Sequence, residues 1–471
     1  MKKYLSEELI RNRLEELDAL NSKKYEPISF LTMAELYSDV FKDYLCYNQD
    51  WGIPMEFDGV KWQVCKNLSV WTSTFTKALI QYTAGYRTPL AEFAFNLTKP
   101  SKARQLETQF KSLLESNVNL EDFDSNPFLI NAQNGVIDLK TGELKPTSGA
   151  SKFLKSVNAD YDPTIDGENR WTKFVLEIMS GDKSKAEFLQ RVLGYSLIGT
   201  KREDKFWIFH GETTRNGKST LMSAVLNVLD NYGCTAQHET FCETYASRTS
   251  SGPSSDIARL SGARLCHVPE PKQHMALDVA KIKQLTGNDS ITARFLNKNE
   301  FEFIPQFSLI FTTNHLPAIN DETIFKSDRV VVIPFEKHFS AEEQDETLRD
   351  LFKTNEYKSI ILKWLVTGAR KYLINRFNNV PEAVKSATER YKVASDTVNY
   401  FVTTRLVRKE ETLLPAADAY IAYLDFCEMN RLTPVGKQSF VKYFKDKDLI
   451  IGTKRIGDRI FSNVIIGYKV A

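Results

Sequence analysis

The sequence predicts an α/β protein whose central part is a parallel sheet carrying a phosphate-binding loop. Between residues 205 and 335, short apolar runs alternate with helical patterns: FWIFH, LMSAVLNVL, ARLCHV, ALDVAKIKQL, SLIFTT and VVVIPF. Strands that alternate with helices are typical of a parallel sheet. The first run leads into a loop that ends in NGKST and opens a helix. Composition is that of a globular protein, with 42% hydrophobic and 26% charged residues.

The loop after the first apolar run has the residue types that hold a nucleoside triphosphate. Backbone N–H groups at a helix start point at the anion, a lysine reaches the outer phosphates, and a hydroxyl helps to hold Mg²⁺. Five residues rather than the usual four separate the first glycine from the Gly-Lys pair. The tetrapeptide GKST also occurs in surface turns, but the flanking strand and helix favour a nucleotide site. The candidate binding residues are Gly211, Asn216, Gly217, Lys218, Ser219 and Thr220.

A nucleotide site also needs a carboxylate to polarise the attacking water or to hold the metal. Glu270 follows the run ARLCHV and is the first candidate, with Pro269 at the position before it. The alternative is a solvated carboxylate at a strand end. Glu239 and Asp256 are weaker candidates. The sequence therefore predicts metal ligation by Ser219, with Glu270 beside it.

Residues 281–305 predict a β-hairpin with a lysine at its tip. Two strand-like runs, 291–296 and 301–304, flank the turn-rich sequence NKNE. Lys298 in that turn suits contact with successive backbone phosphates of a nucleic acid. A surface hairpin with a solvated lysine is the alternative.

Two polar residues adjoin later strands. Asn314 follows the run SLIFTT, at the carboxyl end of a strand, where ligands bind in open α/β sheets. Its amide either positions a water beside the γ-phosphate or caps the turn before Pro317. Arg329 precedes VVVIPF and predicts an arginine finger that acts on a neighbouring subunit. The alternative is a salt bridge of Arg329 with Asp328 or another acid.

Bulk properties limit the class of protein. Sixty-two Lys and Arg against sixty Asp and Glu leave a net charge of +2, so contact with nucleic acid must be local. Six scattered cysteines without a C-x-x-C pair favour reduced thiols and no zinc site. The N-terminus reads as a charged amphipathic helix rather than a signal peptide. No apolar run reaches the length of a membrane span. We expect a cytoplasmic protein without membrane contact.

The order of patterns suggests five domains. Turn signals around 126–146 predict a β-meander, and the tract 160–169 reads as a linker before two helices broken at Gly181-Asp182. Residues 396–471 predict helices followed by a β-hairpin, as in a winged helix. The boundaries are an N-terminal accessory domain, 1–120; a meander and helical collar, 121–200; an ATPase core, 201–340; a helical connector, 341–395; and a winged-helix-like DNA-binding domain, 396–471.

In combination, these motifs resemble a superfamily-3 helicase of the AAA+ class, specifically the helicase portion of the phage/plasmid and poxvirus-type primase-helicases. The resemblance covers most of the chain from about residue 120. It rests on NGVIDLKTGELKP, NGKST, SSDIARLSGARLCHVPEP, KQLTGNDSITARFLNKNEFEF, FTTNHLP and SDRVVVIPF. The fold implied is an AAA+ P-loop ATPase core with a parallel sheet, preceded by a mixed α/β region and helical collar and followed by a winged helix.

The resemblance implies an ATP- and Mg²⁺-dependent replicative helicase that moves 3′-to-5′ on single-stranded DNA as a hexameric ring. It assigns Lys218 and Ser219 to the phosphates and Mg²⁺, Glu270 to the Walker B acid and Asn314 to the sensor. It also assigns Arg329 to the finger. Lys298 is assigned to the DNA-binding hairpin, with Arg294 as a further DNA or interface contact. A phage, plasmid or other mobile element is the expected source.

The resemblance also sets the expected partners and the alternatives. Partners are single-stranded and forked DNA, further copies of the chain, and a separate primase or initiator. Residues 1–120 lack the carboxylate cluster of a primase, so no primase domain is expected. One alternative is a replication initiator that binds an origin, favoured by five cations in the C-terminal domain: Arg405, Arg408, Lys454, Arg455 and Arg459. A P-loop switch or small-molecule kinase is the other alternative.

Overall fold

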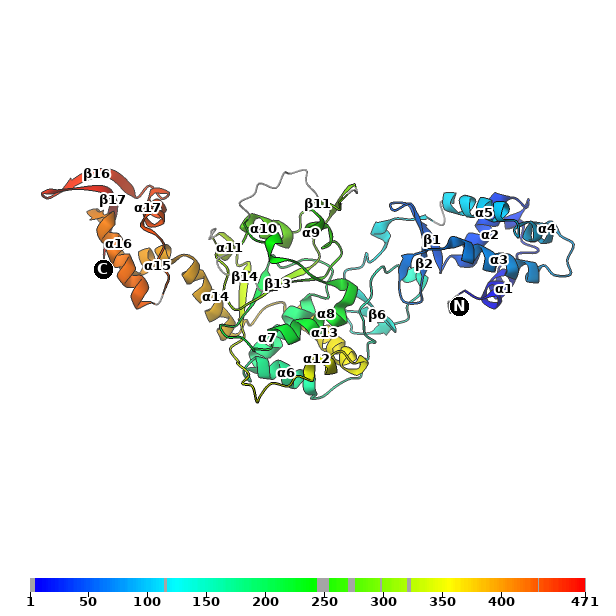
Figure 1. The fold of residues 1–471 in the computed structure, drawn as a ribbon, viewed down its shortest axis with the longest axis horizontal. Coiled ribbons are helices and arrows are strands. Elements are labelled where there is room, and N and C mark those ends of the chain that lie inside the picture. Colours follow the sequence, from blue (N-terminus) through cyan, green and yellow to red (C-terminus); the bar gives the residue numbers. More distant parts are fainter. Residues whose placement is uncertain are drawn as a thin grey trace.

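The computed structural model describes residues 5–113, 117–243, 254–269, 276–296, 299–319, 323–430 and 432–470. The molecule is elongated, with an N-terminal unit at one end, an α/β unit in the middle and a C-terminal unit at the other end (Figure 1). None of the helices in these ranges combines the length and apolar character that a membrane crossing requires.

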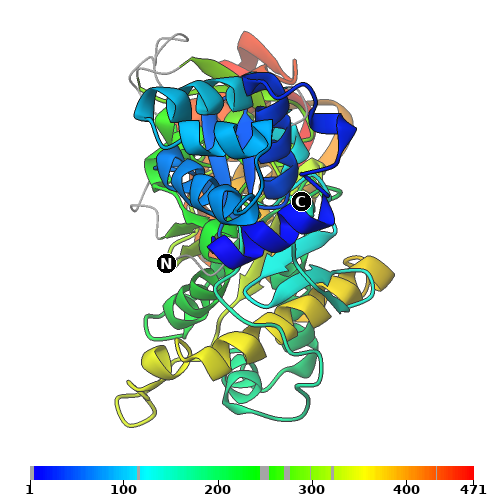
Figure 2. The same cartoon turned by 90° about the vertical axis from the view of Figure 1, so that its right-hand side faces the viewer.

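The N-terminal unit packs five helices around an aromatic core, and these helices face the viewer in Figure 2. Tyr37 contacts Phe41, Phe75 and Phe110 edge-to-face. Ser6 and Thr88 cap helix N-termini with their hydroxyls, as such residues commonly do. The helices are α1 (Glu7–Glu16), α2 (Phe30–Phe41), α3 (Leu68–Tyr82), α4 (Pro89–Asn96) and α5 (Pro100–Ser112).

Beside these helices, a small sheet has the order β3-β2-β1-β4. This sheet has a hydrophobic core separate from that of the helices, and it contains Met55, Phe57, Trp62 and Phe123. The Trp62 indole donates to the carbonyl of Gly149 at 2.8 Å, which ties this sheet to the segment that follows it. The strands are β1 (Leu45–Asn48), β2 (Ile53–Phe57), β3 (Trp62–Val64) and β4 (Asn117–Val118).

An antiparallel meander connects the N-terminal unit to the central one, as the turn signals predict. Its strands are β5 (Leu129–Ala132), β6 (Gly135–Asp138) and β7 (Leu144–Lys145). Gly135 has φ +155, and a Cβ there would lie 2.5 Å from the Lys145 carbonyl oxygen, so the turn requires glycine. Two helices follow, α6 (Arg170–Ile178) and α7 (Lys183–Tyr195), with the break between them at the expected place.

Five parallel strands form the central sheet in the order β14-β8-β13-β10-β9. Successive residues of β8 pack on opposite faces: Trp207 and Phe209 in one core, Phe206 and Ile208 in the other. Because both faces are buried, the strands are continuous apolar runs rather than alternating ones. The strands are β8 (Phe206–His210), β9 (Gly233–Thr235), β10 (Leu265–Pro269), β13 (Ser308–Thr313) and β14 (Val330–Pro334).

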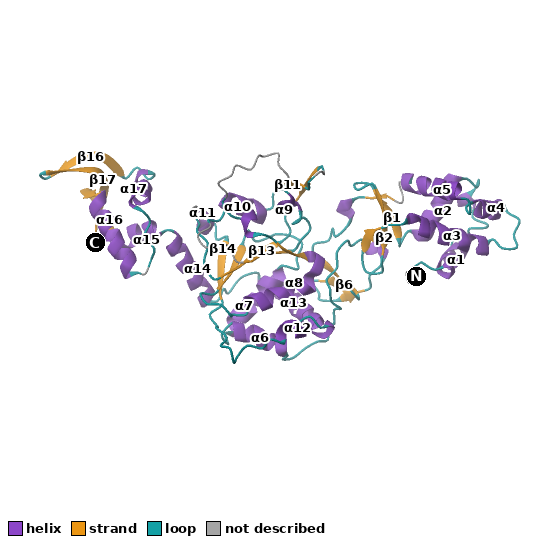
Figure 3. Ribbon diagram, viewed as in Figure 1, coloured by secondary structure: helices purple, strands orange, loops and turns teal. Residues whose placement is uncertain are grey.

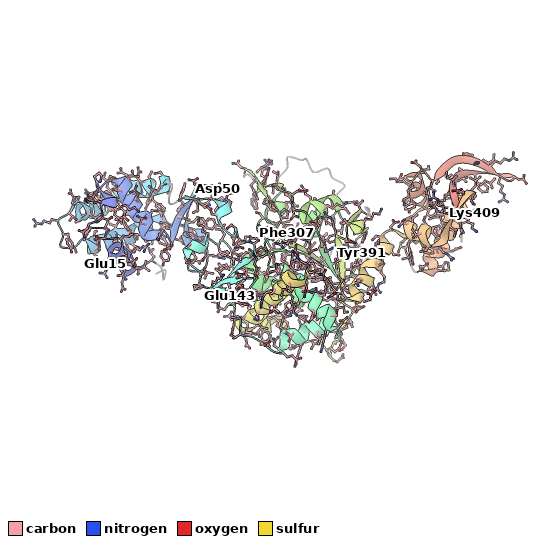
Figure 4. The ribbon with its side chains drawn as sticks, turned by 180° about the vertical axis from the view of Figure 1, so that it is seen from behind. Glu15, Asp50, Glu143, Phe307, Tyr391 and Lys409 are labelled. Atoms are coloured by element: carbon pink, nitrogen blue, oxygen red, sulfur yellow. The ribbon has the colours of Figure 1, made fainter. Side chains whose placement is uncertain are left out.

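Helices cover both faces of this sheet, which lies between them in Figure 3. The face with Trp207 packs on α7, α8 (Lys218–Leu229) and α13 (Asn355–Asn375). The other face packs on α10 (Val279–Thr286) and α14 (Glu382–Ser395), and Figure 4 marks Phe307 and Tyr391 in this region. Short helices are α9 (Ser255–Ala258), α11 (Thr323–Lys326) and α12 (Leu348–Leu351); the hairpin strands are β11 (Ile291–Arg294) and β12 (Glu300–Phe303).

Helices α7 and α13 cross at two glycines. A Cβ on Gly194 would lie 2.2 Å from the Ala369 nitrogen, and one on Gly368 would lie 2.1 Å from the Gln190 carbonyl oxygen. The two backbones therefore approach more closely than any side chain would allow. This crossing fixes α13 against the helical pair that precedes the sheet.

The C-terminal unit has the chain order helix, strand, helix, helix, strand, strand, and its sheet has the order β15-β17-β16. Figure 4 marks Lys409 of this unit at the opposite end of the molecule from Glu15. Its first helix and strand, like β9 in the central sheet, were not predicted. The elements are α15 (Thr397–Arg405), β15 (Leu406–Pro415), α16 (Ala416–Met429), α17 (Lys437–Lys445), β16 (Ile450–Ile456) and β17 (Arg459–Val470).

Candidate nucleotide site

The loop between β8 and α8 requires glycine at two positions, Gly211 and Gly217. Gly217 precedes α8 with φ +81, and a Cβ there would lie 2.4 Å from Ile178 Cγ2. A Cβ on Gly211 would lie 2.2 Å from the side-chain nitrogen of Asn216. That nitrogen donates to the Thr213 carbonyl at 2.6 Å. The extra residue therefore lies in a loop closed by Asn216, and the N–H groups at the start of α8 remain available to an anion.

Lys218 and Asn314 meet at one edge of the sheet. Strands β8 and β13 are parallel neighbours with Thr313 opposite His210, so their carboxyl ends coincide. Lys218 is only 6% exposed, and its ammonium donates to Asn314 Oδ1 at 2.8 Å and to the Gly211 carbonyl at 3.4 Å. The lysine of the phosphate loop and the strand-end amide thus form one polar centre.

A cavity of about 540 Å³ opens over this loop. Ligand sites commonly have this size. Its walls come from the phosphate loop, from α6 and from residues 339–349. The contribution of α6 was not expected from the sequence. The seven-residue spacing of Arg170 and Glu177 could have indicated it, because that spacing places both on one helix face, where they pair at 3.1 Å.

The cavity has a mixed electrostatic character. Cations at its edge include Arg170, Arg215, Lys218 and Arg349, and carboxylates include Glu177 and Glu343. Nearby, burial and then the Lys218 charge lower the pKa of His210. The imidazole is therefore neutral near pH 7 and adds no positive charge to that of Lys218 and the arginines.

The residues present fit a triphosphate with Mg²⁺. Lys218 and the free N–H groups of α8 suit phosphate oxygens, and Ser219 is exposed in the first turn of that helix. Mg²⁺ bound to a nucleotide commonly takes few protein ligands and several phosphate oxygens and waters. Within the described ranges, no group of three His, Cys, Asp or Glu side chains is arranged to hold a metal ion.

Glu270 and Lys298 lie outside the described residues. The two weaker acidic candidates are described, and each contacts a residue other than Lys218 and Asn314. Of the weaker acids, Asp256 accepts from the Thr240 hydroxyl at 3.1 Å and Glu239 pairs with His238 at 3.1 Å. The residues His238, Glu239 and Thr240 of these contacts lie in the segment that follows β9, the last strand in the sheet order.

Arg294 ends β11 opposite Glu300. Its backbone N–H donates to the Ser254 hydroxyl at 3.1 Å, and its carbonyl accepts from the Ser254 N–H at 3.1 Å. These contacts tie the turn end of β11 to the residue that precedes α9.

Arg329 lies at the opposite end of the strands from Lys218. It precedes β14, whose first residue pairs with the first residue of β8, so Arg329 is at the amino ends of the strands. Its guanidinium pairs with Asp204 at 2.9 Å and donates to the Thr286 hydroxyl at 3.2 Å. A five-residue strand spans roughly 16 Å. Arg329 is therefore distant from the phosphate loop of its own chain, and the acid it contacts is Asp204 rather than Asp328.

Three family models match separate parts of the chain. Residues 33–180 match the model described as D5 N terminal like. Residues 209–329 match a family of unknown function, and residues 394–447 match the model described as poxvirus D5 protein-like.

The chain is similar to several viral proteins. A candidate helicase of Acanthamoeba polyphaga mimivirus, L207/L206, is 29% identical over 313 residues, 62% of this chain and 32% of the relative. A candidate helicase of Frog virus 3, 022R, is 27% identical over 58% of this chain and 30% of the relative. A candidate primase of African swine fever virus, C962R, is 22% identical over 66% and 34%. The chain spans about a third of the length of these relatives.

A solved structure of the NrS-1 C-terminal region is 10% identical, with a TM-score of 0.48 over 90% of this chain and 96% of that chain. The D5-type models match on both sides of the phosphate loop, and the viral relatives named as helicases match over more than half of the chain. The chain is therefore similar to D5-type proteins at both ends of its central unit and to viral proteins named as helicases.

Proposed function

We propose that this chain is the ATP-driven motor of a replicative DNA helicase. It would hydrolyse ATP with Mg²⁺ and move 3′-to-5′ on single-stranded DNA as a hexameric ring, in the replication of a virus, phage, plasmid or other mobile element. The observation that carries the proposal is the contact of Lys218 with Asn314 at 2.8 Å, below a cavity next to the start of α8.

The contact supports a nucleotide-sensing role for both residues. Lys218 would exchange the Asn314 oxygen for oxygens of the outer phosphates, and the Asn314 amide would then turn to the γ-phosphate or the attacking water. Ser219 and Thr220 would orient the metal-bound phosphates with their hydroxyls. Glu270 would accept the proton of that water. The bound Mg²⁺ would supply charge stabilisation for the leaving phosphate.

The location of Arg329 supports a role on a neighbouring subunit. An arginine at the amino ends of the strands cannot serve the phosphate loop at their carboxyl ends. It would have to leave Asp204 and enter the site of the adjacent copy, where it would neutralise charge on the γ-phosphate. Asp204 would hold it until a nucleotide-bound neighbour competes for it.

Contact with the translocated strand is assigned to the β11–β12 hairpin. Lys298 and Arg294 would contact backbone phosphates inside the ring, which reconciles DNA binding with a net charge of only +2. Lys298→Ala is expected to keep ATP turnover without DNA and to lose its stimulation by single strands. Unchanged strand separation would exclude the hairpin from the mechanism.

The five predicted domains remain our proposal for the organisation of the chain. The alternation of elements in 396–470 and the sheet order β15-β17-β16 support a winged helix there. Residues 1–120 would act as an accessory unit. This organisation also suits a replication initiator that binds an origin, which is the second candidate function.

The first test is ATP turnover with and without single-stranded DNA. Lys218→Ala is expected to abolish turnover, because the outer phosphates lose their cation, whereas Lys173→Ala removes an exposed lysine of α6 and should not affect it. Strand separation should require a 3′ tail on the loading strand. Wild-type turnover in Lys218→Ala would overturn the assignment. DNA-independent transfer of phosphate to a small molecule would favour a kinase, and duplex binding without unwinding would favour an initiator.

A further inference from the structure

Two cysteines lie opposite each other at one side of the central sheet. Strands β9 and β10 are parallel neighbours, and their register pairs Cys234 with Cys266. Both side chains pack on the same face of the sheet, where Cys266 is buried in the core and Cys234 is partly buried at its margin. Neighbouring strands lie about 4.8 Å apart, within the range of about 4.4–6.8 Å between Cα atoms that a disulfide joins. The register therefore allows a bond between the two sulfurs without a change in strand order.

The pair is reduced in this structure, and its outer strand has room to adjust. Cys234 Sγ donates to the carbonyl of Leu265 at 3.5 Å, which keeps the thiol against β10. Strand β9 has three residues and is the last strand in the sheet order, so its ladder hydrogen bonds run to β10 alone. A disulfide needs Cβ atoms about 3.8 Å apart. A short strand bonded on one side can make that approach at little cost.

The surroundings of Cys234 favour its thiolate. A hydrogen bond from the Cys266 thiol lowers the pKa of Cys234 against the effect of burial, and the charges of Arg259 and Lys155 lower it further. The Lys155 ammonium donates to the carbonyls of Asn231 at 3.3 Å and Ser261 at 3.4 Å. It is thereby held between the segments that lead into β9 and β10. A partly exposed thiol beside cations is the environment of a reactive cysteine.

Other cysteines of the chain have the opposite character. Burial raises the pKa of Cys46 to about 12 and that of Cys242 to about 11. Burial also raises the pKa of Cys266, which therefore remains a protonated thiol next to Cys234. The two members of the pair thus differ in the way that an attacking and a resolving cysteine differ.

We propose that Cys234 and Cys266 form a reversible disulfide when the protein meets hydrogen peroxide. The Cys234 thiolate attacks one peroxide oxygen, an S–O bond forms, the O–O bond breaks and hydroxide leaves. The sulfur loses two electrons in this step and the peroxide gains them. The Cys266 sulfur then attacks the sulfenic sulfur, the S–S bond forms and the S–O bond breaks. The hydroxyl group leaves as water with the proton of the Cys266 thiol.

This modification site is separate from the candidate nucleotide site. Cys266 pairs with Leu309 of β13, and Leu309 pairs with Phe206, the first residue of β8. The cysteine pair therefore lies toward the amino ends of the strands, whereas Lys218 lies beyond their carboxyl ends. The disulfide would close a loop of about 30 residues and hold β9 on β10. The inference goes beyond the proposed function and does not depend on it.

The test treats the full, nucleotide-free chain with a small excess of hydrogen peroxide. Remaining thiols are then alkylated in denaturant, and the chain is digested without reductant for mass spectrometry. Two of the six cysteines should be lost as one linked pair of peptides, joining Cys234 to Cys266, and dithiothreitol should restore both. Cys234 should react about tenfold faster than Cys46 or Cys242, because the thiolate is the nucleophile.

Three variants assign the roles of the two sulfurs. Cys266→Ala should stop at the sulfenic acid of Cys234, which dimedone traps, whereas Cys234→Ala should leave Cys266 reduced. Cys242→Ala is the matched control, since Cys242 is 1% exposed in the same core and lies outside the pair. It should form the disulfide at the wild-type rate. The urea midpoint of the oxidised wild type should exceed that of the reduced protein, and neither variant of the pair should show this shift.

Other outcomes of the peptide map would overturn the inference. These are equal oxidation rates for all cysteines, a link from Cys234 to a different cysteine, or a Cys234–Cys266 link that forms only in denaturant. An unchanged or lower urea midpoint after complete linkage would refute the hold of β9 on β10. None of these readouts requires ATP turnover, so failure of the proposed motor leaves the test intact, and failure of the disulfide leaves the motor untouched.

Discussion

Lys218 and Asn314 are 96 positions apart in the sequence, yet the lysine ammonium donates to Asn314 Oδ1 at 2.8 Å. The contact arises because β8 and β13 are parallel neighbours and both end at the same edge of the sheet. A buried ammonium needs a partner, and the amide oxygen supplies one. In the proposed nucleotide complex, a phosphate oxygen would replace it. The two residues should therefore act on different stages of the same nucleotide cycle.

Asn314→Ala is expected to separate nucleotide binding from turnover. Lys218 and the start of α8 remain, so affinity for a fluorescent ATP analogue should change less than about threefold. The rate of phosphate release should fall on the order of a hundredfold, because a group oriented toward the transition state is lost. Asn314→Asp should instead weaken binding, since an added negative charge pairs with Lys218 and repels the phosphates. Unchanged turnover in Asn314→Ala would contradict a sensing role.

Arg329 gives a prediction about subunits. Mixing Arg329→Ala chains with wild-type chains should reduce turnover more than in proportion to their fraction, because in the proposed ring each arginine would serve a neighbour. Asp204→Ala is the matched variant, since it frees the arginine without removing it. Asp204 is about half exposed, so this change should cost less than about 1 kcal/mol of stability and leave turnover intact or higher. A strictly proportional loss on mixing would indicate a structural role within one chain.

Protonation of His267 is expected to lower the free energy of unfolding of the central unit at acidic pH. It lies in β10, where its Nε2 is 2.9 Å from the Thr312 hydroxyl, and burial lowers its pKa to about 4. A folded pKa below the unfolded value of about 6.5 means that the unfolded chain binds the proton first. Stability is therefore fully present above pH 6.5 and falls as the pH drops toward 4, by about 3 kcal/mol in total.

The measurement for His267 is the urea midpoint between pH 7 and pH 4.5. His267→Gln keeps a polar side chain opposite Thr312 but cannot titrate, so its midpoint should fall less over this range than that of the wild type. The exposed His338 provides the control variant, His338→Gln. Parallel pH profiles for wild type and His267→Gln would contradict the assignment.

The sequence predicted the parts of the fold that have strong local signals. Uninterrupted apolar runs predicted β8, β10, β13 and β14, because strands buried on both faces need apolar residues at every position. The three-residue strand β9 is too short for any period, and its sequence, Gly-Cys-Thr, has little strand character. β15 contains RKEE, which reads as a solvated loop. Its pairing with β17 overrides that local signal.

The candidate site was predictable only where it follows the motif. Asn314 was expected at the carboxyl end of a strand, either beside the γ-phosphate or as a turn cap. Because strand ends in a parallel sheet share an edge, the first alternative implies a position near Lys218. Arg170, Glu177 and the segment 339–349 reach the cavity through tertiary packing of α6 and α12. The spacing of Arg170 and Glu177 indicates only that they share a helix face, and it does not say what that face covers. The partner of Arg329, Asp204, lies 125 positions away. Contacts of this kind depend on topology rather than on spacing.

The crossing of α7 and α13 yields the last prediction, on stability. An alanine in a helix usually gains about 0.5–1 kcal/mol over glycine. At position 368 the added Cβ would lie 2.1 Å from the Gln190 carbonyl oxygen, which is backbone and cannot rotate away. Gly368→Ala should therefore lower the free energy of unfolding by about 1–3 kcal/mol, the range found for overpacked cores.

Gly452→Ala is the control for Gly368→Ala, since a Cβ there would meet nothing within 4 Å. Its melting temperature should match or slightly exceed that of the wild type, whereas that of Gly368→Ala should fall. Because α7 and α13 share one core with α8, the loss of packing should extend to the phosphate loop and weaken nucleotide binding in Gly368→Ala as well. A Gly368→Ala chain as stable as the wild type would mean that the helices can separate without cost, and the rigid support of α8 would then have to come from the sheet alone.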